Sequence, residues 1–175
     1  GLGDVYKRQP VYSSTLRNIW PCNQIFNGLV KMDENLNIVA DIAEQWTISE
    51  DKKVYSFKIR DDVYFHESIF FENKTRKVNA HDFEYSFKRI TDKDIASPGS
   101  WVMNNVESFK AVNDSIFEIN LKEGFNSFIE ILTMKYCSVV PKEVIQSIGD
   151  SFSKNPIGTG PVSYTHLRAH ETKAN

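Results

Sequence analysis

Hydrophobic and polar residues alternate with a period of two in one stretch of the chain. Tyr55, Phe57 and Ile59 are apolar, and the two residues between them are a serine and a lysine. Side chains on a strand point alternately to opposite faces of a sheet, so this pattern predicts a β-strand with one buried face. The polar run at residues 50–52 predicts a turn that joins it to a partner strand beginning at Trp46.

The next regular stretch has the period of a helix. Phe83, Phe87 and Ile90 are spaced by four and three residues, which brings them to one helical face. Asn79 precedes this pattern and suits the N-cap position, and Asp82 is favoured near the positive end of the helix dipole. We therefore predict an amphipathic helix that begins after Asn79 and buries its phenylalanine face.

Shorter elements are expected before these two. Residues 18–29 have the pattern of a short helix, with Pro21 in its first turn and Gly28 at its C-terminal cap. Residues 29–32 have the pattern of a strand, which the polar residues 33–35 would end in a turn.

A hairpin is expected later in the chain, with its turn at Asn113 and Asp114. Its apolar side is predicted to consist of Phe109, Val112, Phe117, Ile119 and Leu121. Strands and helices interleave along the whole chain, and the expected strand pairs are antiparallel. We therefore expect an α+β fold, with a small, mixed, mainly antiparallel sheet and flanking helices.

The last third of the chain is predicted to hold three further elements. Residues 125–134 are expected to be helical, and residues 136–140 to form a short buried strand. Pro141 suits the start of a final helix, in which Val144, Ile145 and Ile148 would point inward, and Gly149 suits its end.

Composition and charge exclude several classes of protein. The chain has 175 residues, 21 of them lysine or arginine and 23 aspartate or glutamate, which gives a net charge of −2. A mildly acidic chain has no electrostatic reason to bind nucleic acid or anionic lipid. The 41% hydrophobic and 13% aromatic content argues for a globular fold and against disorder. No apolar run approaches the roughly 20 residues that a membrane helix needs.

Both ends of the chain resemble translated sequencing adapter. Residues 1–9, GLGDVYKRQ, and residues 162–172, VSYTHLRAHET, resemble the two orientations of one transposon-end adapter. Such segments are set aside before the fold is considered, and here they extend to residue 175. We therefore expect residues 10–161 to be a fragment of a larger domain, and the two end segments to be frayed or loosely packed.

The histidines and cysteines do not have the spacing of a reactive or metal site. His66 and His81 are fifteen positions apart, with no cysteine or carboxylate at zinc-site spacing, so no metal is expected. Cys137 with His81 and Asp82 could belong to a cysteine protease, but no family-specific nucleophile motif surrounds Cys137. Cys22 and Cys137 could form a disulfide or remain two buried thiols, and the sequence leaves both open.

Six segments in a fixed order resemble a known family. They are AEQW from residue 43, SFKIRDDVYFH from 56, AHDFEYSFKRI from 80, SPGSW from 97, LTMKYCSVVPKEVI from 132 and NPIGTGP from 155. Together they resemble the bacterial extracellular solute-binding proteins of family 5, which are the peptide and nickel receptors of ABC importers. The insert at residues 67–77 resembles the version found in Bacteroidota.

The resemblance implies a fold and a function. The family folds as two lobes around a cleft, and this chain would supply the extra domain and the hinge-side segments of that periplasmic-binding-protein-like fold. It would belong to a monomeric periplasmic receptor, anchored by lipid, that captures di- or oligopeptides for a permease of the inner membrane without a cofactor. A nickel-complex or oligosaccharide receptor is an alternative, and an α+β enzyme using Cys137 or His81 is a further one.

The resemblance also suggests which residues face the ligand. Trp101 follows a loop signal at residues 97–99, near a tryptophan that contacts ligand in the nickel-binding branch. Tyr136 and Cys137 fall where relatives have cleft-facing residues, and Trp20 and Asn23 fall near the hinge side of the cleft. Packing is the alternative for each apolar candidate, and it is favoured for all but Trp101: a surface tryptophan at 101, a buried strand at 136–137 and a core tryptophan at 20.

The glycine-rich turn at Gly158, Thr159 and Gly160 is expected to return the chain to the large lobe. It has too few glycines for a phosphate-binding loop and lacks the lysine of one. A tight backbone bend is enough to explain this composition.

Overall fold

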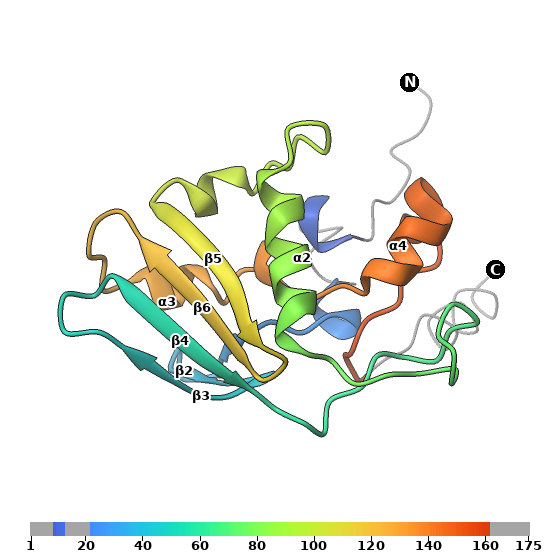
Figure 1. Cartoon of the computed structure of the whole chain (residues 1–175), viewed down its shortest axis with the longest axis horizontal. Coiled ribbons are helices and arrows are strands. Elements are labelled where there is room, and N and C mark those ends of the chain that lie inside the picture. The colour runs from blue at the N-terminus through green and yellow to red at the C-terminus, as the bar shows by residue number, and fades with distance from the viewer. Residues whose placement is uncertain (1–8, 13–21, 162–175) are drawn as a thin grey trace.

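The computed structural model describes residues 9–12 and 22–161 of the chain (Figure 1). After a helical turn at residues 22–25, the elements follow in this order: β1 Val30–Met32, β2 Ile38–Ala40, β3 Ala43–Ile48, β4 Val54–Ile59, α2 Ala80–Thr91, β5 Val106–Asn113, β6 Ile116–Leu121, α3 Phe128–Ile131 and α4 Lys142–Ile148. Short 3₁₀ helices lie between them: η1 Pro10–Tyr12, η2 Ser100–Met103, η3 Lys135–Cys137 and η4 Gly149–Ser153. The expected α+β class is confirmed.

Four strands form an antiparallel sheet in the order β3-β4-β6-β5, and β1 pairs with β2 in a separate hairpin. The strand expected to begin near Trp46 does pair with the strand at 55–59, with Trp46 opposite Phe57. Helix α2 packs against β5 and β6 on one side and α4 on the other (Figure 1). The helix thus joins the sheet to the carboxyl-terminal part of the chain.

The predicted hydrophobic faces meet between the sheet and α2. Tyr55, Phe57 and Ile59 are buried along β4, and Phe83 and Phe87 are fully buried on α2. Aromatic contacts connect the two layers. The Phe117 ring of β6 lies edge-to-face on Phe87, with 5.2 Å between centroids, and tilted against Phe83 at 5.9 Å. Both periodicities in the sequence therefore gave the correct buried face.

Helix α2 begins where the sequence predicts, at a complete capping box. The Asn79 side chain accepts a hydrogen bond from the Asp82 amide at 3.3 Å, and the Asp82 carboxylate accepts one from the Asn79 amide at 3.0 Å. Two backbone donors that a helix start would leave without partners are thus satisfied.

The expected hairpin is found, but its turn lies at residues 114–115, because Asn113 is the last residue of β5 and pairs with Ile116. Val112 was wrongly expected on the apolar side of the hairpin. Val112 is 52% exposed, while Phe109 and Ala111 are half-buried and packed on the core. Phe109 and Ala111 are two positions apart and point to the inner face of β5, so Val112, the next residue, points to the outer face. The register between β5 and β6 also shifts between Ala111 and Asn113, as it does at a β-bulge.

Two elements of the last third differ from prediction. The helix expected at 125–134 is only the four residues of α3, and the strand expected at 136–140 is η3 followed by extended chain. The extended part is buried as expected, but its amides find other acceptors: Val139 donates to Asn27 O at 2.9 Å and Val140 to Ser86 Oγ at 3.0 Å. Residues 138–140 are buried and extended like a strand but pair with no other strand of the described chain, so their hydrophobic pattern alone predicted a strand.

The last predicted helix begins and ends where the sequence predicts, but the first one does not end at its predicted cap. Helix α4 has Pro141 before its first residue and Gly149, with φ +51°, after its last. Gly28 does not cap a helix, because the helical turn ends at residue 25. Residues 18–21 of the expected first helix lie outside the described residues.

Of the two end segments, residues 1–9 and 162–175, the structure describes only Gln9. Residues 1–8 and 162–175 lie outside the described residues. Gln9 is 5% exposed, and its side-chain oxygen accepts a hydrogen bond from Arg89 at 2.8 Å. The expected loose packing is therefore wrong for Gln9.

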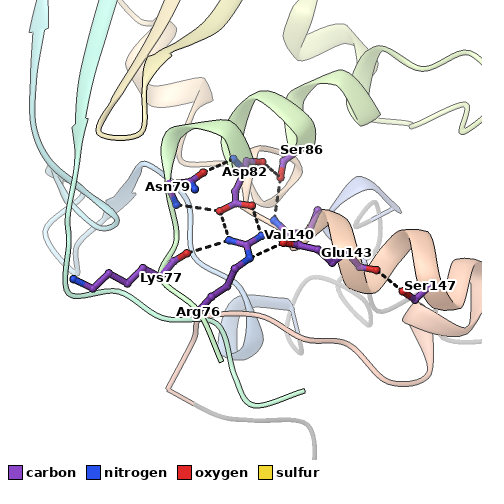
Figure 2. A network of polar contacts seen from close by, with 8 residues as sticks. All are labelled: Arg76, Lys77, Asn79, Asp82, Ser86, Val140, Glu143 and Ser147. Carbon is purple, nitrogen blue, oxygen red and sulfur yellow. Dashed lines mark hydrogen bonds and ion pairs between the residues drawn. The ribbon is translucent and has the colours of Figure 1, made fainter. Parts of the chain in front are cut away.

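A network of charges joins the insert to α2 and α4 (Figure 2). The Arg76 guanidinium donates to both oxygens of Asp82, at 2.7 and 2.8 Å, and to both oxygens of Glu143, at 2.7 Å each. The Arg76 Cζ atom also lies 5.0 Å from the centroid of the Phe65 ring and 5.4 Å from that of the Phe71 ring. Burial opposes the charge of Arg76, but the two carboxylates outweigh it and raise the pKa of the guanidinium.

Replacing Phe87 with alanine should lower the free energy of unfolding by about 3–5 kcal/mol, because the change leaves a cavity between α2 and the sheet. Phe70→Ala is a matched control, since the Phe70 ring is 37% exposed, and it should cost less than about 1 kcal/mol. Chemical denaturation would measure both values. A loss below about 1 kcal/mol for Phe87→Ala would show that this face is not the core.

Candidate functional site

An open pocket of about 600 Å³ lies where segments far apart in the sequence meet. The helical turn at 22–25, strand β1, η2 and the chain from the end of α3 into η3 contribute its walls: Asn23, Lys31, Met32, Trp101, Thr133, Met134, Lys135 and Tyr136. The volume is in the range of sites that bind small molecules. Three of the residues suggested from the sequence, Asn23, Trp101 and Tyr136, come together here.

A close contact between a loop and a ring positions Trp101. Gly99 lies on the Tyr136 ring so closely that an added Cβ would be 2.3 Å from ring carbons, so a larger residue would push the loop away. The Ser97 hydroxyl holds the same loop, since it donates to Val11 O at 2.6 Å and accepts from the Gly99 amide at 3.1 Å. The Trp101 side chain is 46% exposed and borders the pocket.

Cys137 does not line the pocket, although it follows Tyr136. Its side chain is fully buried, and burial raises the pKa of the thiol to about 12. The reactive form of cysteine is the thiolate, so this sulfur is unsuited to nucleophilic chemistry at neutral pH. Cys22 is also buried, and neither cysteine forms a disulfide. Of the two states that the sequence left open, two buried thiols is the one found.

The two histidines among the described residues, His66 and His81, lie apart from the pocket lining. His81 is on the exposed side of α2, where its Nε2 is 3.3 Å from an Asp114 carboxylate oxygen and its side chain is 57% exposed. Within residues 9–12 and 22–161, no group of three His, Cys, Asp or Glu side chains could hold a metal ion. Trp20, the remaining cleft candidate, lies outside the described residues.

The turn at Gly158, Thr159 and Gly160 packs against the helical turn at 22–25. An added Cβ would lie 2.0 Å from Ile25 O at Gly158 and 2.2 Å from Gln24 O at Gly160, so both positions need glycine. The Gly160 amide donates to Ile25 O at 2.8 Å. The turn therefore fixes the segment that carries Asn23, although its own residues do not line the pocket.

A chain of polar contacts, which the sequence gave no reason to expect, connects this turn with the pocket. Thr159 Oγ1 donates to Asn27 Oδ1 at 2.9 Å, and Asn27 Nδ2 donates to the Asp41 carboxylate at 3.0 and 3.1 Å. Lys31, a pocket residue, is 3.8 Å from the same carboxylate. Asp41 follows β2 and belongs to no recognisable motif, so only the fold shows that it links Asn27 to Lys31.

The His66 ring contacts the turn at residues 158–160 through both of its nitrogens. Its Nε2 is 2.7 Å from Gly160 O, and its Nδ1 accepts from the Gly158 amide at 3.4 Å. Only the neutral ring with its proton on Nε2 satisfies both contacts. Burial accordingly lowers the pKa of His66, although the bond to Gly160 opposes the shift.

A family model matches the chain from residue 37 to residue 171. It is described as the middle part of the bacterial extracellular solute-binding proteins, family 5. The chain belongs to this family. The resemblance found in the six sequence segments is thereby confirmed.

Individual relatives agree with the family assignment. The chain is 28% identical over 161 residues to a di/tripeptide-binding protein of Pseudomonas aeruginosa. This alignment covers 82% of the present chain and 30% of the relative. The periplasmic binding protein DppA of Helicobacter pylori, solved with the peptide STSA, superposes with a TM-score of 0.80 at 26% identity. That match covers 89% of this chain and 34% of DppA.

A nickel-binding structure is similar as well. NikZ of Campylobacter jejuni, solved with Ni(L-His), gives a TM-score of 0.75 at 28% identity and covers 93% of this chain and 32% of NikZ. The neighbours support the expected periplasmic-binding-protein-like fold. This family 5 chain spans about a third of the length of the relatives that it matches.

The lowered pKa of His66 makes stability depend on pH. The unfolded histidine has a pKa near 6.5 and the folded one a lower value, so the stabilisation is present above about pH 6.5 and is lost as the pH falls toward the folded pKa. In His66→Gln the amide can still donate to Gly160 O but cannot be protonated. We expect unfolding midpoints in urea to fall less between pH 7.5 and 5.5 for His66→Gln than for the wild type.

The exposed histidine provides the control for this measurement. His81→Gln should retain the wild-type dependence on pH, because His81 has no buried contact to lose. Parallel pH profiles for the wild type and His66→Gln would contradict the assignment of a buried neutral ring.

Proposed function

We propose that this chain is part of the substrate-binding component of an ABC importer, which captures di- or oligopeptides and delivers them to a permease of the inner membrane. The observation that carries the proposal is the pocket beside Trp101 and Tyr136 in a chain of this family. Relatives named for di/tripeptide binding, and a neighbour solved with a peptide, support peptides as the ligand class.

The lining of the pocket suits peptides of varied sequence. Met32, Trp101 and Met134 are 43%, 46% and 40% exposed, so three large apolar side chains gather at one opening. Exposed apolar patches of this kind commonly mark binding surfaces. Methionine adapts to differently shaped partners, and Asn23 and Thr133 can hydrogen-bond to peptide groups.

The pocket would be one wall of a larger cleft. It is open to solvent on this chain, and the chain spans about a third of its relatives. In this proposal a second lobe, outside the chain, closes over the peptide and excludes water. The turn at residues 158–160 would be the hinge-side exit to that lobe.

The setting of the full protein is part of the proposal. We infer a periplasmic, lipid-anchored, monomeric receptor that needs no cofactor and binds no nucleic acid. No helix within the described part of the chain is long and apolar enough to cross a membrane. The enzymatic alternative has no support from Cys137, whose thiol is buried and protonated.

Peptide titration of the 175-residue chain, followed by NMR, would test the proposal. We expect short peptides at about 10 mM to shift the Trp101 indole and the Met32 and Met134 methyl signals. Binding should be no tighter than about millimolar, roughly −4 kcal/mol, because an open wall leaves polar contacts in competition with water. Trp101→Ala should weaken binding by about 1 kcal/mol or more.

Controls separate the pocket from the rest of the surface. Leu36→Ala removes an apolar side chain that is 76% exposed outside the pocket, and it should leave affinity unchanged. An absence of shifts at the pocket would contradict peptide binding there, and shifts with Ni(L-His) or an oligosaccharide alone would favour those receptors. Micromolar affinity would show that the chain is a complete binding domain.

A further inference from the structure

The pocket has an uneven distribution of charge. Lys31 and Lys135 both line it, and among the residues that the structure describes no aspartate or glutamate does. The chain as a whole is mildly acidic, with a net charge of −2. The local excess of positive charge is therefore a property of this pocket and not of the protein surface in general.

The nearest described carboxylate does not fully neutralise these lysines. Asp41 lies outside the lining, and its oxygens already accept from Asn27 Nδ2, at 3.0 and 3.1 Å, and from the Gly28 amide at 3.2 Å. Its distance to Lys31 Nζ is 3.8 Å, beyond a good hydrogen bond. The Lys31 side chain is 55% exposed and has donors available for a ligand.

Lys135 is more confined than Lys31. Its ammonium group donates to Phe26 O at 3.5 Å, a long contact for a charged donor. Burial lowers the pKa of Lys135, and the Asp41 charge only partly opposes the shift. A ligand anion next to this group would favour its charged form.

We propose that the pocket selects peptides that carry a carboxylate close to an apolar side chain, with Lys31 and Lys135 binding the carboxylate. The apolar group would lie against Trp101 and the two methionines. This inference rests on the proposed function, because it specifies the ligand of the same pocket. The carboxylate can be the carboxyl terminus or an acidic side chain, since both offer the same two oxygens.

Three capped dipeptides distinguish these sources on the full chain. N-acetyl-Leu-Gln amide has no carboxylate, N-acetyl-Leu-Gln acid has one at its terminus, and N-acetyl-Leu-Glu amide has one on its side chain. At low salt we expect NMR titration of the Trp101 indole to give about three- to tenfold tighter binding for at least one acid than for the amide. The preference should shrink in about 0.5 M NaCl.

A closely matched pair of variants tests the role of Lys31. Lys31 and Lys110 both lie on strands, each is 3.8 Å from a carboxylate, and their side chains are 55% and 62% exposed. Lys31→Gln should remove most of the preference for the acid, while Lys110→Gln should retain it. Lys135→Gln should also reduce the preference, provided that its unfolding midpoint matches the wild type.

The possible outcomes separate this inference from the proposed function. Equal affinity for all three peptides, with shifts at the pocket, would overturn the carboxylate preference and leave peptide binding in place. A preference that survives Lys31→Gln and the folded Lys135→Gln would overturn the assignment to these lysines. The absence of pocket shifts with every peptide would overturn both proposals.

Discussion

The rest of the structure depends on the pairing of Arg76 with Asp82. Asp82 is 5% exposed and closes the capping box that starts α2, so its charge has little water around it. Arg76 compensates that charge and shares its own with Glu143 on α4. Breaking a buried pair by removing one partner typically costs about 3–5 kcal/mol, since an uncompensated charge is left behind. One guanidinium thus holds the insert, α2 and α4 in a single arrangement.

That arrangement determines where the pocket walls lie. Ser86, one turn after Asp82 on α2, donates to Asp82 O and accepts from the Val140 amide, so the helix fixes the segment that follows Tyr136 (Figure 2). The same segment is joined to the first part of the chain by the bond from Val139 to Asn27 O. The segment that carries Tyr136 is therefore positioned by hydrogen bonds of its own backbone amides.

Local sequence patterns correctly predicted the elements whose formation depends on residues close together in the chain. The strand at 55–59, the helix after Asn79 and the hairpin at Asn113 each have a periodicity or cap that needs no distant partner. The run at 136–140 was misread because its amides bind Asn27 and Ser86, which no local pattern reveals. The lysines of the pocket were missed for a similar reason, since Lys31 and Lys135 are 104 positions apart and meet only in the fold.

Tyr136 and Cys137 are adjacent in the sequence, but only Tyr136 lines the pocket. A strand would place neighbouring side chains on opposite faces, and the 3₁₀ turn of η3 likewise sends one to the pocket and the other to the core. Both geometries allow only one of the two residues to reach a ligand, and the Tyr136 ring at the pocket also packs against Gly99. The pocket is therefore lined by the Tyr136 ring together with Lys31 and Lys135, while the Cys137 thiol is buried in the core.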